Sequence, residues 1–169
     1  MNNTQVTLHG KALKLAGELL RVGQKAPDFS VVDTDLKPVK LSDFAGKPLV
    51  ISAVPSLDTE ICDLQTRRFN QEAARLGDQV TILTISMDLP FAQKRWCGAA
   101  GVDRVKTLSD HRQASFGQAY GLLIEELRLL ARAVILVDAK GVVRYVQVVP
   151  KIETEPDYND VMQALKKII

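Results

Sequence analysis

The stretch PSLDTEIC, residues 55–62, combines a nucleophile with a local structure that could activate it. It follows an apolar run at residues 48–54, which predicts a buried strand, and it precedes a helical pattern. With Thr59 as the N-cap of that helix, Cys62 occupies the first turn, where backbone N–H groups have no partners inside the helix. These groups favour a thiolate, the reactive form of cysteine. The apolar residues expected on one face of the helix are Ile61, Leu64, Phe69, Ala73 and Leu76.

Three carboxylates lie close to this cysteine in sequence: Asp58, Glu60 and Asp63. Like charges that faced the sulfur would oppose thiolate formation. At a helix N-terminus, however, the same carboxylates stabilise the helix, and alternate residues can point away from the sulfur. The sequence therefore leaves open how strongly the thiolate is favoured.

The positions of Pro55, Thr59 and Cys62 match the Pro-x-x-x-Thr/Ser-x-x-Cys signature of the peroxiredoxins. With Asp58 included, the string resembles the thiol peroxidase subfamily. The segment LLARA, residues 129–133, is similar to the one that holds the family's active-site arginine, and APDF at residues 26–29 also matches. This resemblance covers nearly the whole chain. It implies a thioredoxin-like fold and a peroxidase.

The resemblance also implies a role for each matching residue. Cys62 would attack one peroxide oxygen and become a sulfenic acid. The Thr59 hydroxyl would accept a hydrogen bond from the peroxide and donate one along the path of the reaction. Arg132 would stabilise the thiolate and the departing oxygen, and Pro55, which lacks an N–H, would wall the pocket against water.

Cys97 lies 35 residues after Cys62, which resembles the atypical two-cysteine pattern of the thiol peroxidases. Cys97 would then be the resolving cysteine, and the disulfide would form within one chain. The alternative is an inert core residue beside Trp96. Because both thiols are expected within helices, we expect the turns around Cys62 and Cys97 to unwind locally before the sulfurs can bond.

The length of 169 residues predicts a single domain over residues 1–169. Its 22 basic and 20 acidic residues form no block that would indicate a nucleic-acid partner. The sequence has no apolar run long enough to span a bilayer and no signal-peptide pattern at its start, so we expect a cytoplasmic protein without a membrane partner. The two histidines, His9 and His111, do not cluster with the cysteines as zinc ligands would. We expect neither a metal nor an organic cofactor.

The order of the expected elements indicates an α/β fold with a mixed central sheet flanked by helices. A β-hairpin extension is expected within residues 1–17, with strands at 4–8 and 12–15. The other expected strands are at 29–33, 39–41, 48–54, 79–86, 105–108, 133–138 and 142–149. The expected helices start near Cys62, near residue 90, at 112 (ending at 120) and at 156.

The resemblance implies hydrogen peroxide and organic, alkyl or lipid, hydroperoxides as substrates. It further implies thioredoxin as the reductant and a homodimer. A rival hypothesis is a thioredoxin-like binding or redox-sensing module, in which a pair formed by Cys62 and Cys97 switches an interaction without turnover. A dithiol-disulfide oxidoreductase is disfavoured because the sequence has no CxxC motif.

Overall fold

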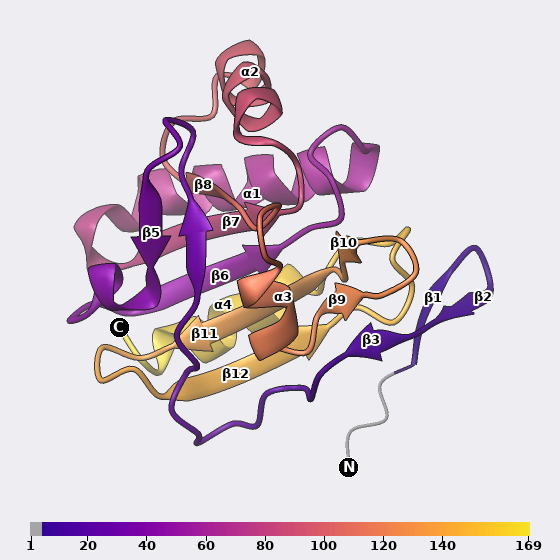
Figure 1. Ribbon diagram of the computed structural model, residues 1–169. Coiled ribbons are helices and arrows are strands. Elements are labelled where there is room, and N and C mark those ends of the chain that lie inside the picture. The colour runs from indigo at the N-terminus through magenta and orange to yellow at the C-terminus, as the bar shows by residue number, and fades with distance from the viewer. Residues whose placement is uncertain (1–4) are drawn as a thin grey trace.

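The computed structural model describes residues 5–169, and a seven-stranded mixed sheet lies at its centre (Figure 1). The strands of this sheet are β4 (Ser30–Val32), β5 (Pro38–Lys40), β6 (Leu49–Ala53), β7 (Thr81–Ser86), β8 (Lys106–Ser109), β11 (Ala133–Val137) and β12 (Val143–Val148). Their order across the sheet is β12-β11-β6-β7-β8-β4-β5. Strand β6 is parallel to β7, and β7 is parallel to β8, whereas the other neighbours are antiparallel.

Four α-helices lie within the described residues: α1 (Glu60–Leu76), α2 (Pro90–Ala100), α3 (Ser115–Ala119) and α4 (Tyr158–Lys166). Helix α1 connects β6 to β7, and α2 connects β7 to β8, as parallel neighbours require. Figure 1 shows α1 and α4 behind the sheet and α3 in front of it. The predicted α/β class with a mixed sheet is confirmed. Helix α3 is shorter than the predicted span of 112–120.

The predicted N-terminal hairpin is present as β1 (Val6–Leu8) and β2 (Lys11–Leu13). Its expected first residue, Thr4, lies outside the described residues. The sequence did not predict a second small sheet, in which β9 (Leu123–Ile124) pairs with both β3 (Leu15–Ala16) and β10 (Leu129–Leu130). Strands of two residues are too short to show an alternating pattern.

The hairpin is fixed to a segment that lies far away in the chain. The Thr7 N–H donates to the Pro150 carbonyl at 2.8 Å, and the Ile152 N–H donates to the Thr7 carbonyl at 3.0 Å. The turn between its strands uses positive φ angles at His9 (49°) and Gly10 (84°). The hairpin is therefore held against the chain that follows β12.

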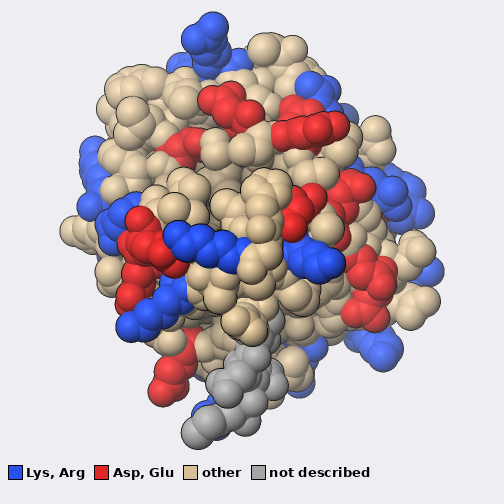
Figure 2. Space-filling model, turned by 90° about the vertical axis from the view of Figure 1, so that its right-hand side faces the viewer, with Lys and Arg blue, Asp and Glu red and all other residues tan. Residues whose placement is uncertain are grey.

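Charges of both signs are interspersed on the side of the molecule that carries the hairpin (Figure 2). Two ion pairs join β2 and its flank to the turn between β9 and β10: Lys11 to Glu126 at 4.0 Å and Lys14 to Glu125 at 3.5 Å. Exposed pairs of this kind contribute at most about 1 kcal/mol each. The hairpin is thus held mainly by its backbone hydrogen bonds and its buried side chains, such as Val6.

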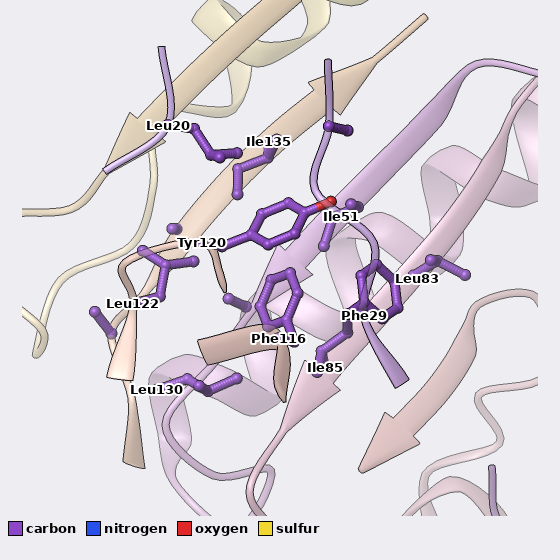
Figure 3. Close-up of a cluster of buried hydrophobic side chains, with 14 of the residues drawn as sticks. Leu20, Phe29, Ile51, Leu83, Ile85, Phe116, Tyr120, Leu122, Leu130 and Ile135 are labelled. Atoms are coloured by element: carbon purple, nitrogen blue, oxygen red, sulfur yellow. The ribbon is translucent and has the colours of Figure 1, made fainter. Parts of the chain in front are cut away.

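Alternate residues of the central strands face two separate hydrophobic clusters. In β6, Val50 belongs to the cluster under α1 and α4, whereas Ile51 belongs to the cluster on the other face. Figure 3 shows the second cluster, where the rings of Phe29, Phe116 and Tyr120 pack together with centroids 4.5 to 5.8 Å apart. These two hydrophobic clusters, one on each face of the sheet, fix the orientation of the central strands.

The buried face of α1 differs from the predicted one. Leu64 is 42% exposed, and Ile61 is only half-buried. The buried residues are Cys62, Gln65, Thr66, Phe69 and Ala73. The prediction is confirmed for Phe69 and Ala73. It is wrong for Leu64, because it ranked residues by apolar character, whereas the buried polar side chains here are satisfied by hydrogen bonds.

One buried carboxyl group, that of Asp110, makes stability depend on pH. It is 2% exposed and accepts hydrogen bonds from the N–H groups of Phe116 (3.0 Å) and Gly117 (2.8 Å). Burial raises the pKa of Asp110 from 3.8 to about 6, although the backbone donors act in the opposite direction. Because the folded chain holds this proton more tightly than the unfolded chain, the stabilising contribution is complete below about pH 4 and is lost as the pH rises through about 6.

We therefore expect the free energy of unfolding of the wild type to fall by about 3 kcal/mol more than that of Asp110→Asn between about pH 3 and 7, because Asn has no proton to lose. Urea unfolding at a series of pH values measures both profiles. The Asn variant is less stable at low pH, since only the oxygen of its side-chain amide can accept a hydrogen bond, whereas Asp110 accepts one on each of its two oxygens. Parallel profiles for the two proteins would contradict the assignment.

Candidate active site

Cys62 lies in the first turn of α1, as predicted. The N-cap is Thr59, so Cys62 is the third helical residue, and it is fully buried against Val54 and Leu57. The Thr59 hydroxyl donates to the Ser56 carbonyl at 2.9 Å and makes no side-chain cap. The amide groups at the start of the helix are thus not occupied by the capping side chain. The Thr59 oxygen still has lone pairs to accept a hydrogen bond.

Asp88 fixes the loop that leads into this helix. Its carboxylate accepts from the Ser56 hydroxyl at 2.7 Å, from the Leu57 N–H at 2.8 Å and from the Ser86 hydroxyl at 2.8 Å. Sequence reasoning missed Asp88. A signal existed, because Asp88 follows β7, and the carboxyl ends of the parallel strands β6 and β7 meet at one edge of the sheet.

Arg132 lies immediately before β11, at the point where Ala133 pairs with Ala53 of β6. It is 2% exposed. Its Nε donates to the Ile152 carbonyl at 2.8 Å, and its Nη1 donates to Gln65 Oε1 at 3.0 Å. Gln65 is oriented in turn, because its Nε2 donates to the Ser52 hydroxyl at 2.7 Å. The guanidinium is therefore held in one orientation by uncharged partners.

Within residues 5–169, none of the ion pairs includes Arg132. A buried cation without a carboxylate partner is energetically costly. It can bind an anion, or a group that becomes negative during a reaction, without first losing an ion pair. This favours a role for Arg132 in binding developing negative charge.

A cavity of about 240 Å³ brings together three of the predicted residues, Pro55, Thr59 and Arg132. Its other walls come from the β1–β2 hairpin, the start of α1, the β9–β10 pair and the segment after β12. The remaining lining residues are Leu8, His9, Glu60, Ile61, Ile124, Leu127, Leu129, Ile152 and Glu153. Most of these side chains are apolar. Cys62 is buried beside this cavity at the helix start and does not line it.

The three carboxylates near Cys62 are placed in different ways. Asp63 is directed toward α2, where it accepts from the Trp96 Nε1 at 2.9 Å and pairs with Arg67 at 2.9 Å. Asp58 and Glu60 are exposed side chains. One charge is therefore paired with a cation, and the other two are screened by solvent.

Cys97 is half-exposed on α2, and its Sγ lies 3.2 Å from Thr107 Oγ1 of β8. Cys97 does not belong to the hydrophobic cluster that Cys62 forms with Val54 and Leu57. Both cysteines are free thiols. The residue that packs against the Cys62 cluster from α2 is Trp96. The structure thus brings Pro55, Thr59 and Arg132 together around one cavity and places Cys62 at the adjoining start of α1. Cys97 lies apart from them on α2.

Comparison with known proteins decides the family. The Redoxin family model matches residues 21–162. The chain is 55% identical over 161 residues to the thiol peroxidase of Halalkalibacterium halodurans, covering 95% of this chain and 96% of that protein. It is 56% identical over 164 residues to the thiol peroxidase of Oceanobacillus iheyensis, covering 97% and 99%. The chain belongs to the thiol peroxidases, a subfamily of the peroxiredoxins.

The fold of this thiol peroxidase agrees with that assignment. A peroxiredoxin-like protein from Aquifex aeolicus superposes with a TM-score of 0.92 at 41% identity, covering 98% of each chain. The predicted thioredoxin-like peroxiredoxin fold is thereby confirmed, as is the thiol-dependent peroxidase activity. The rival hypothesis of a non-catalytic module is not favoured. In the described part of the thiol peroxidase, no helix has both the length and the apolar character needed to cross a bilayer.

Proposed function

We propose that this thiol peroxidase reduces hydrogen peroxide and organic hydroperoxides through Cys62, with Pro55, Thr59 and Arg132 forming the substrate site. The observation that carries the proposal is the position of the unpaired Arg132 guanidinium in a cavity that adjoins the start of the Cys62 helix. The helix amides and the guanidinium would then stabilise charge at both ends of the line joining sulfur and the two oxygens.

In the first step, the Cys62 thiolate attacks the nearer peroxide oxygen. A sulfur–oxygen bond forms and the oxygen–oxygen bond breaks, so that the sulfur loses two electrons to the peroxide. The departing oxygen leaves as an alkoxide or hydroxide and is protonated to an alcohol or water. Arg132 stabilises the negative charge on that oxygen, while the Thr59 hydroxyl accepts from the peroxide O–H.

In the second step, the Cys97 sulfur attacks the Cys62 sulfenic acid. A disulfide forms within the chain, and the hydroxyl leaves with the thiol proton as water. Family membership supports thioredoxin as the reductant of this disulfide and a homodimer as the working form. The proposal includes a cytoplasmic location, because a reducing compartment must regenerate the thiols.

The apolar lining of the cavity supports alkyl or lipid hydroperoxides as substrates in addition to hydrogen peroxide. Leu8, Ile124, Leu129 and Ile152 offer an apolar surface to an organic tail. Hydrogen peroxide cannot use this surface. The expected preference is therefore for a substrate with a hydrocarbon chain.

The test is to treat the reduced protein with one equivalent of cumene hydroperoxide and to measure intact mass and free thiols. We expect the wild type to lose both thiols as an intramolecular disulfide. Cys97→Ser should stop at a sulfenic acid on Cys62, because no second thiol is present to resolve it. If Cys62 stays a thiol in the folded protein, the proposed chemistry at Cys62 is wrong.

A further inference from the structure

The buried residues of helix α2 lie in its first half only. Of its eleven residues, only Pro90 and Gln93 are buried. The Gln93 Nε2 donates to the Ser86 hydroxyl at 3.0 Å and to the Leu108 carbonyl at 2.8 Å. The second half contains Gly98, which lowers helix stability by about 1 kcal/mol relative to alanine. This half, which carries Cys97, is therefore the part of the helix that unwinds most easily.

Three side chains hold this second half against α1. The Trp96 Nε1 donates to Asp63 Oδ1 at 2.9 Å, and Arg67 pairs with Asp63 Oδ2 at 2.9 Å. The Arg67 Nη1 also donates to the carbonyl of Ala100, the last residue of α2, at 3.2 Å. The Arg67 guanidinium lies 5.9 Å from the centroid of the Trp96 ring. We call Asp63, Arg67 and Trp96 the α1–α2 clamp.

The clamp connects the neighbours of the two cysteines, since Asp63 follows Cys62 and Trp96 precedes Cys97. Consecutive residues of a helix project about 100° apart. Trp96 accordingly faces the Cys62 cluster, whereas Cys97 faces Thr107 of β8. Cys97 cannot replace Trp96 beside Cys62 while this half of α2 stays helical. Trp96 must leave its place before the sulfurs can meet.

We propose that the α1–α2 clamp positions Cys97 away from Cys62 and that its release limits the rate of disulfide formation. This inference rests on the proposed function, in which Cys97 resolves the Cys62 sulfenic acid. While the clamp is closed, the sulfenic acid can react with a second peroxide molecule. That peroxide would transfer one oxygen to the sulfur, giving a sulfinic acid, and its other oxygen would leave as alcohol or water. The clamp therefore sets how the sulfenic acid divides between disulfide and sulfinic acid.

Arg67→Met is the cleanest test, because Arg67 is exposed and does not line the cavity. The variant removes the Asp63 pair and the bond to Ala100. After rapid mixing with cumene hydroperoxide, samples are quenched with a thiol-alkylating agent and with dimedone, and sulfenic acid, disulfide and sulfinic acid are separated by mass. We expect sulfenic acid to form at the wild-type rate within twofold. Disulfide formation should be about tenfold faster, because the loss of one charge-assisted hydrogen bond lowers the free-energy cost of releasing the clamp by an amount that corresponds to about tenfold in rate.

Trp96→Phe supplies a second, independent variant. It keeps an aromatic ring at this position but removes the N–H that donates to Asp63, so we also expect faster disulfide formation. In both variants the fraction of sulfinic acid at excess peroxide should fall. A role in stability alone would not change this partition between the two products.

Arg68→Met is the matched control. Arg68 is exposed, pairs with Glu72 four residues away at 3.5 Å and stands over Tyr158 instead of α2. Its disulfide rate should equal that of the wild type. Disulfide formation in Arg67→Met that is unchanged or slower overturns the clamp. If the wild type forms no Cys62–Cys97 disulfide at all, the proposed function itself fails, and the two failures are thus distinguished.

Discussion

Cys62→Ser is expected to lower peroxidase activity by at least about a thousandfold, because a serine hydroxyl is not ionised and is a far weaker nucleophile than a thiolate. The measurement is consumption of cumene hydroperoxide with thioredoxin, its reductase and NADPH as the electron source. Cys62 is fully buried among Val54 and Leu57, so the new hydroxyl costs about 1 to 3 kcal/mol of stability. Thermal unfolding of the variant must therefore be measured alongside activity.

The control for this loss is Cys97→Ser, which keeps the proposed nucleophile. With one equivalent of hydroperoxide per chain, it should still consume that equivalent without further turnover, whereas Cys62→Ser should consume none. Since the chain has two cysteines, the pair of variants separates attack on the peroxide from resolution. A folded Cys62→Ser protein that retains more than a few per cent of the activity would place the nucleophile elsewhere.

Arg132→Lys is expected to lower kcat/KM by about 10²- to 10³-fold, although it keeps the positive charge. The size of the effect is that of removing one preorganised donor from a developing oxyanion. A lysine ammonium on a flexible stem cannot reproduce the planar guanidinium that bonds both the Ile152 carbonyl and Gln65. Stopped-flow measurement of the first oxidation of Cys62 isolates this step from later ones.

Arg128→Lys is the matched control for that variant. Arg128 lies four residues earlier in the chain, is exposed and does not line the cavity. Its replacement should leave the first oxidation unchanged. If Arg132→Lys oxidises Cys62 within threefold of the wild-type rate while it remains folded, the charge alone is sufficient and the orientation imposed by Gln65 has no role in catalysis.

The position of Cys62 could be predicted from sequence because it depends on neighbouring residues only. A buried strand, a turn and a helix follow one another within residues 48–76, and this local order places the cysteine in the first turn. The terminal helix was predictable for the same reason, since Val161 and Leu165 share one face of α4. Both results rest on short-range periodicity.

The partners of Cys62 could not be predicted in this way. Arg132 reaches the site through the antiparallel pairing of β11 with β6, and nothing in the local sequence around residue 132 specifies that pairing. Only the family resemblance identified it. Gln65 and Asp88 were missed because a buried polar residue is recognised by its hydrogen-bond partners, which depend on the tertiary structure. The α1–α2 clamp was missed for the same reason.

The attachment of the β1–β2 hairpin to the segment after β12 has a consequence for the order of events during synthesis. The cavity needs Leu8 and His9 from the first residues of the chain and Arg132, Ile152 and Glu153 from its last quarter. No fragment that stops short of residue 153 can contain the complete cavity, although Cys62 is made much earlier. A chain still emerging from the ribosome therefore carries the thiol without its guanidinium and without its substrate pocket, and full reactivity toward peroxide arises only when these long-range contacts close.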